Sequence, residues 1–499
     1  MKFNETASAI EANASGFPAM KRIDDKKELI SIVINAMLKG DTFYKSESSI
    51  INDIILKTKN IIKEDEDFIM KLTVYTRTVM NLRSVSHLLA ATVLQNVHYT
   101  GKKRIMLEQI MIRPDDAMEI LALTNLWKMK IPNAFRRAVK NCLENKWDLY
   151  QFKKYECRKC KIKLADLVKL THPNALLWAK NHNSDEKNVF QKIIENDLPA
   201  IDTAQTVNAG NVGEDRAKKY EKMLLEDKLG LMALLKNLKN ILETTQNDVV
   251  VGQICRILSS RSKVLRSRVL PFRFVQAYQA LTQIPNLNMF SKQLIEASLD
   301  MGFSSTGTNL EIVEPNDRVA IIMDESSSMT WEYNNGNRPF DIGIQMMASI
   351  LTSLRKENTV GIFFGSRARI VDIDFKSPLS WIANQKAYGA STNFTSALHM
   401  LHASKTKVDK LIIFTDMQEN ECNRHDKNFR SMLNAYRNDI NKNVKVLFWN
   451  LGSYGGSTPI SENQGMLEVG GFSQNMLPVI GKIWKDKDAL IKEIEGIKL

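Results

Sequence analysis

The sequence predicts two architectures in series: an all-α domain of many helices, then an α/β domain with a doubly wound parallel sheet. Three observations support this prediction. Apolar residues recur at helical spacing up to about residue 300, a stretch rich in Gly, Ser, Thr and Asn covers 301–317, and strand-like and helical segments alternate after it. A chain of 499 residues also exceeds the usual size of one hydrophobic core. We therefore expect domains at residues 1–305 and 306–499.

The N-terminal part is predicted to be helical almost throughout. The segment LMALLKNLKNIL places Leu231, Leu235, Leu238 and Leu242 on one face of a helix. Pro and Gly are sparse, and short polar breaks separate one helical segment from the next. Many helices joined by short links predict an α-solenoid, in which each unit stacks on its neighbours.

The C-terminal part alternates between strand-like and helical segments. This order predicts a parallel sheet with helices on both faces. The runs 359–365 and 368–374 are too close together for a crossover connection, so we expect a hairpin at one edge of the sheet. The other predicted strands are 318–324, 410–416 and 444–450, and the predicted helices are 340–357, 394–404 and 428–440.

Composition and apolar patterning predict the cellular compartment of the protein. No apolar run has the length of a membrane span, and the polar N-terminal segment lacks the apolar centre of a signal peptide. Five scattered cysteines are too few for a disulfide framework. We therefore expect a cytoplasmic protein with reduced thiols and no membrane partner.

Two of the cysteines, Cys157 and Cys160, have the spacing of half a zinc site, with Cys142 and His172 as candidate partners. The second half of a zinc pattern is missing. A thioredoxin-like motif would need a preceding strand, and this segment is predicted to be helical. We interpret Cys157 and Cys160 as incidental thiols.

A set of oxygen-bearing side chains follows the predicted strands. Asp324 ends the run IIMD, with Ser326 and Ser328 directly after it. Thr392 precedes a predicted helix, and Asp416 ends a later strand. Because ligands of open α/β sheets lie at the carboxyl ends of the strands, we expect these side chains to converge. Carboxylates and hydroxyls suit a hard divalent cation such as Mg²⁺, whereas a serine-rich turn or helix cap is the alternative for each motif taken singly.

The order of these motifs resembles a von Willebrand factor A (vWA) domain. The resemblance rests on D-x-S-x-S from Asp324 to Ser328, on Thr392 before a helix, and on Thr-Asp ending at Asp416. It implies a metal-ion-dependent adhesion site in which Ser326, Ser328 and Thr392 touch the metal. Asp324 and Asp416 would bind it directly or through water. An open coordination position would then accept an acidic group of a protein partner.

The formal net charge of +13 is concentrated in two parts of the helical region. Between residues 128 and 163 there are twelve basic residues and three acids, and 251–274 contains basic residues and no acid. Such clusters attract a phosphate backbone. Four aromatic residues, Trp147, Tyr150, Phe152 and Tyr155, are interleaved with the first cluster. They could stack on bases, but at helical spacing we favour a place in the core. The candidate RNA contacts are Arg136, Arg137, Lys140, Lys153, Lys154, Arg158, Lys159, Lys161, Lys163, Arg261 and Arg266.

Several segments are similar to the TROVE module of the Ro autoantigen family, which is also followed by a vWA-like domain. They are NAFRRAVKN (133–141), YQFKKY (150–155), LADLVKLTHP (164–173), LMALLKNLKN (231–240) and RVLPFRFVQAYQAL (268–281). The resemblance implies HEAT-like helical repeats that close into a ring. It also implies binding of small noncoding Y RNAs on the outer basic surface and of single-stranded ends of misfolded RNA through the hole. Arg136, Arg137 and Lys140 match the basic helix that contacts RNA in that family.

Three functions remain open at this point. The first is a monomeric ribonucleoprotein scaffold with a role in RNA quality control or processing. The second is a metal-dependent adhesion module that recruits an acidic protein partner. The third is a Mg²⁺-dependent RNA-processing enzyme, but the sequence contains neither G-x-S-x-G nor G-x-x-x-x-G-K-[ST]. We therefore expect a scaffold and not an enzyme.

Overall fold

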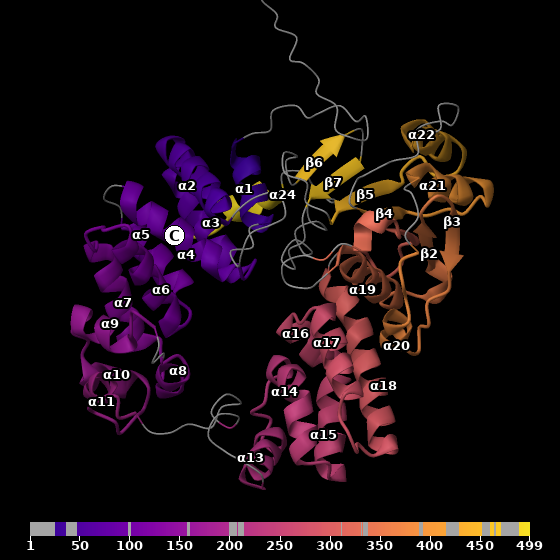
Figure 1. Cartoon of the computed structure of the whole chain (residues 1–499). Helices are drawn as coiled ribbons and strands as arrows, with labels where there is room; N and C mark the ends of the chain where they lie inside the picture. Colours follow the sequence, from indigo (N-terminus) through magenta and orange to yellow (C-terminus); the bar gives the residue numbers. More distant parts are fainter. Residues whose placement is uncertain are drawn as a thin grey trace, which may run out of the picture. The chain divides into compact units, whose positions relative to one another are not determined.

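The computed structural model divides the chain into two compact units, each described here by itself (Figure 1). One contains the described residues up to 207 together with 489–499, and the other contains those from 214 to 470. We refer to them as the helical unit and the mixed unit. The structure describes residues 25–35, 47–97, 101–156, 160–198, 207, 214–310, 312–330, 332, 338–388, 393–415, 429–451, 460–463, 466–470 and 489–499.

The helical unit is built from two rows of stacked helices. Helices α3, α5, α7, α9 and α11 pack in succession, and α2, α4 and α6 form a second row. This is the pattern of an α-solenoid, as the sequence predicts. The elements are α1 (Asp25–Asn35), α2 (Glu47–Glu64), α3 (Glu66–Thr78), α4 (Arg83–Asn96), α5 (Lys102–Ile110), α6 (Pro114–Leu126), α7 (Asn133–Asn145), α8 (Leu149–Lys154), α9 (Leu164–Thr171), α10 (Ala175–Asn181), α11 (Val189–Glu195) and α24 (Ala489–Glu495).

Polar side chains cap several of these helices. Asp65 accepts a hydrogen bond from the Phe68 amide at 2.9 Å at the start of α3. Asn174 accepts from the amides of Leu176 and Leu177 at the start of α10. Each cap satisfies an amide that has no partner within its helix, which fixes where the helix begins.

The C-terminal helix α24 packs on α3 at the other end of the sequence. The Tyr75 hydroxyl donates to Glu493 Oε2 at 2.6 Å, and Lys71 Nζ donates to the Glu495 carbonyl at 2.7 Å. Residues 489–499 therefore belong to the helical unit, although they follow the sheet in the sequence. The predicted limits 1–305 and 306–499 separate helices from strands, whereas the compact units divide the chain at other places.

The mixed unit begins with a group of helices, of which the last two pack directly on helices of the α/β part. The group comprises α13 (Glu214–Leu225), α14 (Leu231–Thr244), α15 (Asp248–Leu258), α16 (Arg261–Ser267), α17 (Pro271–Thr282) and α18 (Met289–Thr306), followed by the 3₁₀ turn η1 (Gly307–Leu310). Helix α18 contacts α19 (Pro339–Thr352). The turn η1 also packs on α19, so closely that a Cβ on Gly307 would lie 2.2 Å from the Ser349 carbonyl oxygen. A larger residue at 307 would force the two elements apart.

A seven-stranded sheet forms the rest of the mixed unit, in the order β3-β2-β1-β4-β5-β7-β6. The central strands are parallel, and both edge pairs, β2–β3 and β6–β7, are antiparallel. The predicted hairpin at one edge is confirmed, and the strands at the other edge were not predicted. The strands are β1 (Val319–Asp324), β2 (Thr359–Phe364), β3 (Ala368–Val371), β4 (Lys410–Thr415), β5 (Lys445–Asn450), β6 (Ile460–Asn463) and β7 (Met466–Gly470).

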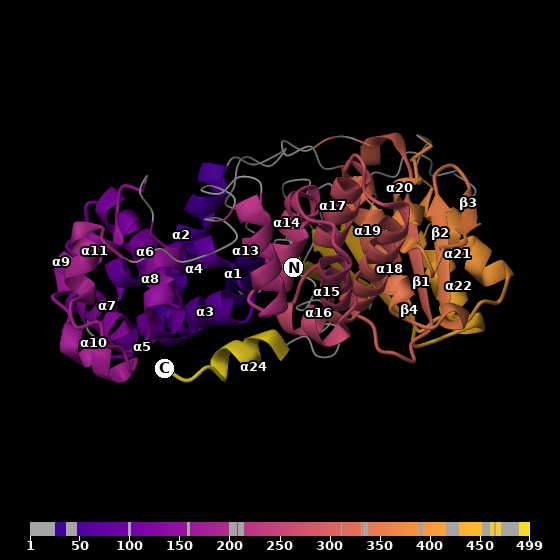
Figure 2. The ribbon, with the colours of Figure 1, turned by 90° about the horizontal axis from the view of Figure 1, so that it is seen from below.

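Helices cover both faces of the sheet (Figure 2). On one face, α21 (Phe394–Ala403) and α22 (Phe429–Asp439) bury Leu401 and Leu433 against Ile322 and Ile413. On the other face lie α19 and α20 (Pro378–Ala383), with Phe340 and Phe363 in an edge-to-face contact at 6.1 Å. The predicted α-helical region followed by a doubly wound α/β domain is confirmed.

Candidate functional site

The carboxyl end of β1 carries the acid around which the candidate metal site is built. Asp324 is completely buried. Its Oδ1 accepts from the Ser326 amide at 2.9 Å, and its Oδ2 accepts from the Thr415 hydroxyl at 2.7 Å. Because β1 and β4 are parallel neighbours, their ends bring Asp324 and Thr415 together. The ends of β1 and β4 thus meet at the predicted edge, whereas the convergence of Asp324 with Thr392 and Asp416 stays a prediction.

The two serines of the D-x-S-x-S motif lie beside this carboxylate. Ser326 Oγ and Ser328 Oγ share a hydrogen bond at 3.1 Å, with Ser326 buried and Ser328 partly exposed. In an octahedral Mg²⁺ site with ligand distances of about 2.0–2.1 Å, adjacent ligand oxygens lie roughly 3 Å apart. The two hydroxyls therefore have the spacing of neighbouring ligands of one Mg²⁺ ion.

The other two predicted ligands, Thr392 and Asp416, lie outside the described residues. Their described neighbours reach the same edge. Asn393 donates its amide to the Gly365 carbonyl at 3.0 Å, and Asn393 Oδ1 accepts from the Ser396 amide to cap α21. Thr415, which precedes Asp416, ends β4.

An arginine beside this edge was missed by sequence reasoning. Glu325 is buried, and Arg369 on β3 donates to it through Nη2 at 2.8 Å. The Arg369 guanidinium also lies 4.7 Å from the ring centroid of Phe363 and 5.0 Å from that of Tyr388. The sequence did contain an indication of this pair. Glu325 follows Asp324 inside the D-x-S-x-S motif, and an acid buried there needs a cationic or hydrogen-bonding partner.

A basic helix face is the main candidate for RNA contact in the helical unit. On α7, Phe135, Val139 and Cys142 are buried, whereas Arg136, Arg137 and Lys140 are exposed. Lys140 Nζ approaches Glu144 only at 3.9 Å, so this cation is not strongly neutralised. The three predicted contacts on α7 are therefore available to a ligand.

The remaining predicted contacts of this unit differ in availability. Lys153 is half-buried and donates to Glu156 Oε2 and the Leu198 carbonyl, both at 3.2 Å, which indicates a structural role. Lys154 is exposed, with its Nζ 5.2 Å from the Tyr150 ring centroid. Lys161 and Lys163 are exposed, and Arg158 and Lys159 lie outside the described residues.

Two of the four interleaved aromatic residues lie in the core, as we favoured, and Tyr155 is half-buried. Trp147 and Phe152 have no exposed surface, and the Trp178 indole donates to the Trp147 carbonyl at 2.8 Å. Tyr150, in contrast, is 43% exposed. Of these residues it is the one best placed to stack on a base.

A second basic surface lies in the mixed unit. Arg261 and Arg266 are exposed on α16, with Arg256 and Arg268 exposed on either side. Arg261 Nη2 donates weakly to the Thr308 hydroxyl at 3.4 Å. Both predicted contacts in this segment are thus accessible.

The cysteines do not form a metal site among the described residues. No group of three His, Cys, Asp or Glu side chains in that part of the chain could hold a metal. Burial raises the pKa of the Cys142 thiol to about 12, and His172 is an exposed residue that ends α9. Cys160 is disulfide-bonded, so the prediction of reduced thiols is wrong there; Cys157 lies outside the described residues.

Fold and site together define a class of protein: a helical-repeat protein whose chain continues into a vWA-type α/β domain with a D-x-S-x-S edge. The family model of the TROVE domain matches residues 215–358, and that of the Ro60 vWA domain matches 318–483. A solved structure, that of the Ro (RSR) protein of Deinococcus radiodurans, has a TM-score of 0.61 and 17% identity, covering 92% of this chain and 100% of that one.

The chain belongs to the Ro family, in which a TROVE domain precedes a vWA domain. Membership of this ribonucleoprotein family implies an RNA partner. The TROVE match begins near the start of α13, so the RNA candidates on α7 lie outside it, whereas Arg261 and Arg266 lie inside it. Among the described residues, no helix has the length and apolar character needed to cross a membrane.

Proposed function

We propose that this protein is an RNA-binding scaffold that holds small noncoding RNA and single-stranded ends of misfolded RNA, with a role in RNA quality control in the cytoplasm. The observation that carries the proposal is the exposed row Arg136, Arg137 and Lys140, opposite the buried face of α7. We also propose that the helical repeats close into a ring and that the protein is a monomer. Family membership supports it because Ro proteins are ribonucleoproteins.

The test is RNA binding by the full chain over a salt series. In Arg136→Glu/Arg137→Glu, affinity for a structured small RNA should fall at least roughly tenfold at low salt, because phosphate contacts are lost and repulsion is added. Each lost contact should also reduce the slope of log affinity against log salt by about 0.7–0.9. Arg355→Glu/Arg367→Glu changes the charge equally at exposed arginines of the mixed unit and serves as control. Equal losses in both variants would contradict the assignment to α7.

We also propose that the carboxyl edge of the sheet binds a divalent cation, Mg²⁺ in particular, through Asp324, Ser326, Ser328, Thr392 and Asp416. The spacing of the two serine hydroxyls supports a hard cation there. A bound cation would supply positive charge to attract an acidic side chain of a protein partner. Calorimetric titration with Mg²⁺ should show binding that is lost in Ser326→Ala/Ser328→Ala and kept in Ser353→Ala/Ser404→Ala. Retained binding in the first variant would exclude these ligands.

The enzymatic alternative has its own test. We propose that the protein holds RNA without cleaving it. Labelled RNA incubated with protein and Mg²⁺ should remain intact. Cleavage that disappears in Asp324→Asn would instead establish a Mg²⁺-dependent nuclease.

A further inference from the structure

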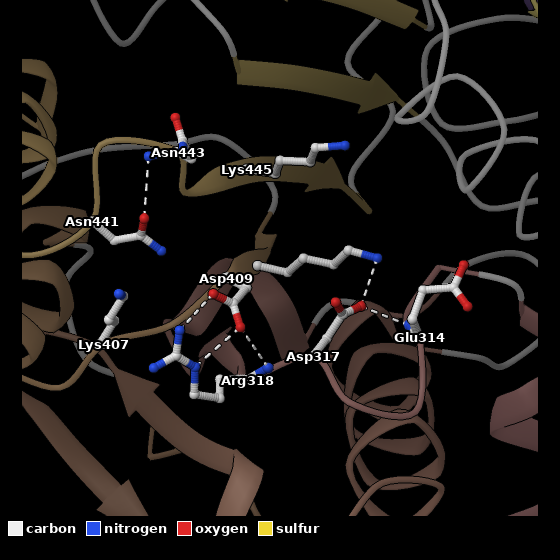
Figure 3. A pocket seen from close by; sticks show the side chains of 9 residues that line it. Glu314, Asp317, Arg318, Lys407, Asp409, Asn441, Asn443 and Lys445 are labelled. Carbon is white, nitrogen blue, oxygen red and sulfur yellow. Dashed lines mark hydrogen bonds and ion pairs between the residues drawn. The ribbon is translucent and has the colours of Figure 1, made fainter.

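Basic side chains of the two units differ in whether they already have partners. In the polar pocket at the amino ends of the strands, Arg318 donates to Asp409 through Nε at 3.1 Å and Nη2 at 2.8 Å (Figure 3). On α7, in contrast, the exposed side chains of Arg136 and Arg137 have no hydrogen bond or ion pair with any other described residue. The guanidinium groups of α7 are therefore available to a ligand.

Three asparagine side chains form a hydrogen-bonded ladder beside these arginines: Asn141 and Asn145 on α7 and Asn181 on α10. Asn181 donates through Nδ2 to Asn145 Oδ1 at 2.6 Å and to the Glu144 carbonyl at 3.2 Å. Asn145 donates in turn through Nδ2 to Asn141 Oδ1 at 2.7 Å and to the Asn141 carbonyl at 3.1 Å. These bonds fix the direction in which each amide of the asparagine ladder points.

The asparagine ladder leaves a hydrogen-bond donor at the end nearest the arginines. Asn141 is four residues after Arg137, a spacing that makes two side chains neighbours on one helix face. Its Oδ1 accepts from Asn145, whereas its Nδ2 donates to no group in the part of the chain that the structure describes. The side chain is partly exposed, and the bond that its oxygen accepts strengthens donation by its nitrogen. Asn141 therefore presents N–H donors to a ligand bound at the arginines.

The arginines and the Asn141 amide suit different parts of an RNA strand. Guanidinium groups bind phosphates, which carry no sequence information, whereas hydrogen bonds to base edges read sequence. Side chains cannot read the deep and narrow major groove of paired A-form RNA, so sequence-specific contacts are made mostly to unpaired bases. A neutral amide donor beside phosphate-binding cations thus fits an unpaired base of a loop, a bulge or a strand end.

We propose that α7 binds an unpaired segment of RNA and that Asn141 donates to a carbonyl oxygen of one of its bases. This rests on the proposed function, because it places the RNA at Arg136 and Arg137. It adds the kind of RNA segment that is bound and a contact that distinguishes one base from another. Uracil carries carbonyl oxygens and adenine carries none, so α7 prefers segments rich in uracil to segments rich in adenine.

The test compares oligouridine and oligoadenosine, each bound to the full chain and followed by fluorescence anisotropy over a salt series. In Asn141→Ala, affinity for oligouridine should fall about two- to tenfold, the range expected for the loss of one hydrogen bond. Affinity for oligoadenosine should fall less, so the preference for uridine shrinks. The slope of log affinity against log salt should stay unchanged for both probes, because a neutral amide releases no counterions.

Two controls separate base contact from a structural effect. Asn384→Ala removes an exposed amide of the mixed unit and should bind both probes as the wild type does. A blunt RNA duplex should bind equally to Asn141→Ala and the wild type. Urea unfolding checks that Asn141→Ala folds; the bond between Asn181 and Asn145 does not involve the substituted side chain. Equal losses for both single strands, a changed salt slope or a loss for the duplex overturns the proposal.

Failure of this proposal and failure of the proposed function give different results. If Arg136→Glu/Arg137→Glu weakens RNA binding while Asn141→Ala keeps the preference of the wild type, RNA is held at α7 and the base contact is rejected. If neither variant changes RNA binding, both proposals are rejected. A wild type that binds oligouridine no better than oligoadenosine rejects the base contact alone.

Discussion

Two completely buried aspartates, Asp116 in the helical unit and Asp324 in the mixed unit, have different surroundings. Asp116 accepts from Arg83 Nε at 2.7 Å and Arg77 Nη2 at 2.8 Å, with His87 Nε2 3.0 Å away. Burial opposes its ionisation, but the bonds from His87, Arg77 and Arg83 outweigh burial and hold the pKa of Asp116 well below its usual range. Asp324 accepts instead from a backbone amide and a threonine hydroxyl.

These surroundings indicate different roles: Asp116 is a structural carboxylate, and Asp324 is a candidate metal ligand. Asp116 is enclosed by cationic side chains from α3 and α4, so its charge ties these helices to α6. Asp324 lies at a strand end where hydroxyl oxygens gather with the spacing of metal ligands. Asp116 is thus neutralised within the protein, whereas the surroundings of Asp324 fit an added cation.

The largest expected effect comes from breaking the Asp116 network. In Asp116→Asn, buried Arg77 loses its counter-charge and the partly exposed Arg83 loses one of its two, so the free energy of unfolding should fall by about 3–5 kcal/mol. Urea unfolding of the full chain measures the loss, and hydrogen exchange in α3, α4 and α6 assigns it to the helical unit. Asp115→Asn removes a more exposed partner of Arg83 and should cost less than about 1 kcal/mol. Similar losses in the two variants would show that Asp116 is not the centre of the network.

A smaller effect is expected at Asp300, a buried aspartate of α18 in the mixed unit. Burial raises its pKa to about 6, although its Oδ1 accepts from the Leu379 amide at 2.9 Å. The folded state therefore holds the proton more tightly than the unfolded state, whose pKa is near 3.8. The free energy of unfolding should accordingly fall as pH rises through this interval, so the charged form costs stability at neutral pH.

Asp300→Asn should remove that cost while keeping an oxygen for the Leu379 amide. The expected gain at pH 7 is about 1–3 kcal/mol, with none at pH 4, because one pKa unit corresponds to about 1.4 kcal/mol. Urea unfolding between pH 4 and pH 7 measures it. Glu357→Gln, which removes an exposed carboxylate of the same unit, is the control. A gain of the same size at pH 4 would mean that better packing, and not ionisation, is responsible.

Local patterns in the sequence predict much of this molecule. The apolar runs ending at Asp324 and next to Asp416 mark β1 and β4, and helical spacing separates Phe135 and Val139 from the basic face of α7. The order of the D-x-S-x-S motif and the Thr-Asp pair then predicts the edge at which Asp324 and Thr415 meet.

Features that depend on distant contacts were not predicted. Helix α24 packs on α3 from the opposite end of the chain, and no local pattern encodes that pairing. Strand β6, ISEN, lacks an alternating apolar run, so its pairing with β7 is not visible in the sequence. The partners of Asp116 come from separate helices, and Arg369 reaches Glu325 only because β3 folds back on β2.

Arg369 allows a last test of the difference between Asp116 and Asp324, because its guanidinium places a cation of the protein near Asp324. In Arg369→Met, buried Glu325 loses its partner, and the free energy of unfolding should fall by about 1 kcal/mol, a modest loss because Arg369 is partly exposed. If Mg²⁺ binds at the Asp324 edge, the added cation should also offset the charge of Glu325, so Mg²⁺ should stabilise the variant more than the wild type. Urea unfolding with and without Mg²⁺ measures both effects, with Arg367→Met as the exposed control. Equal stabilisation of Arg369→Met and wild type would show that Glu325 and the cation site are electrostatically independent.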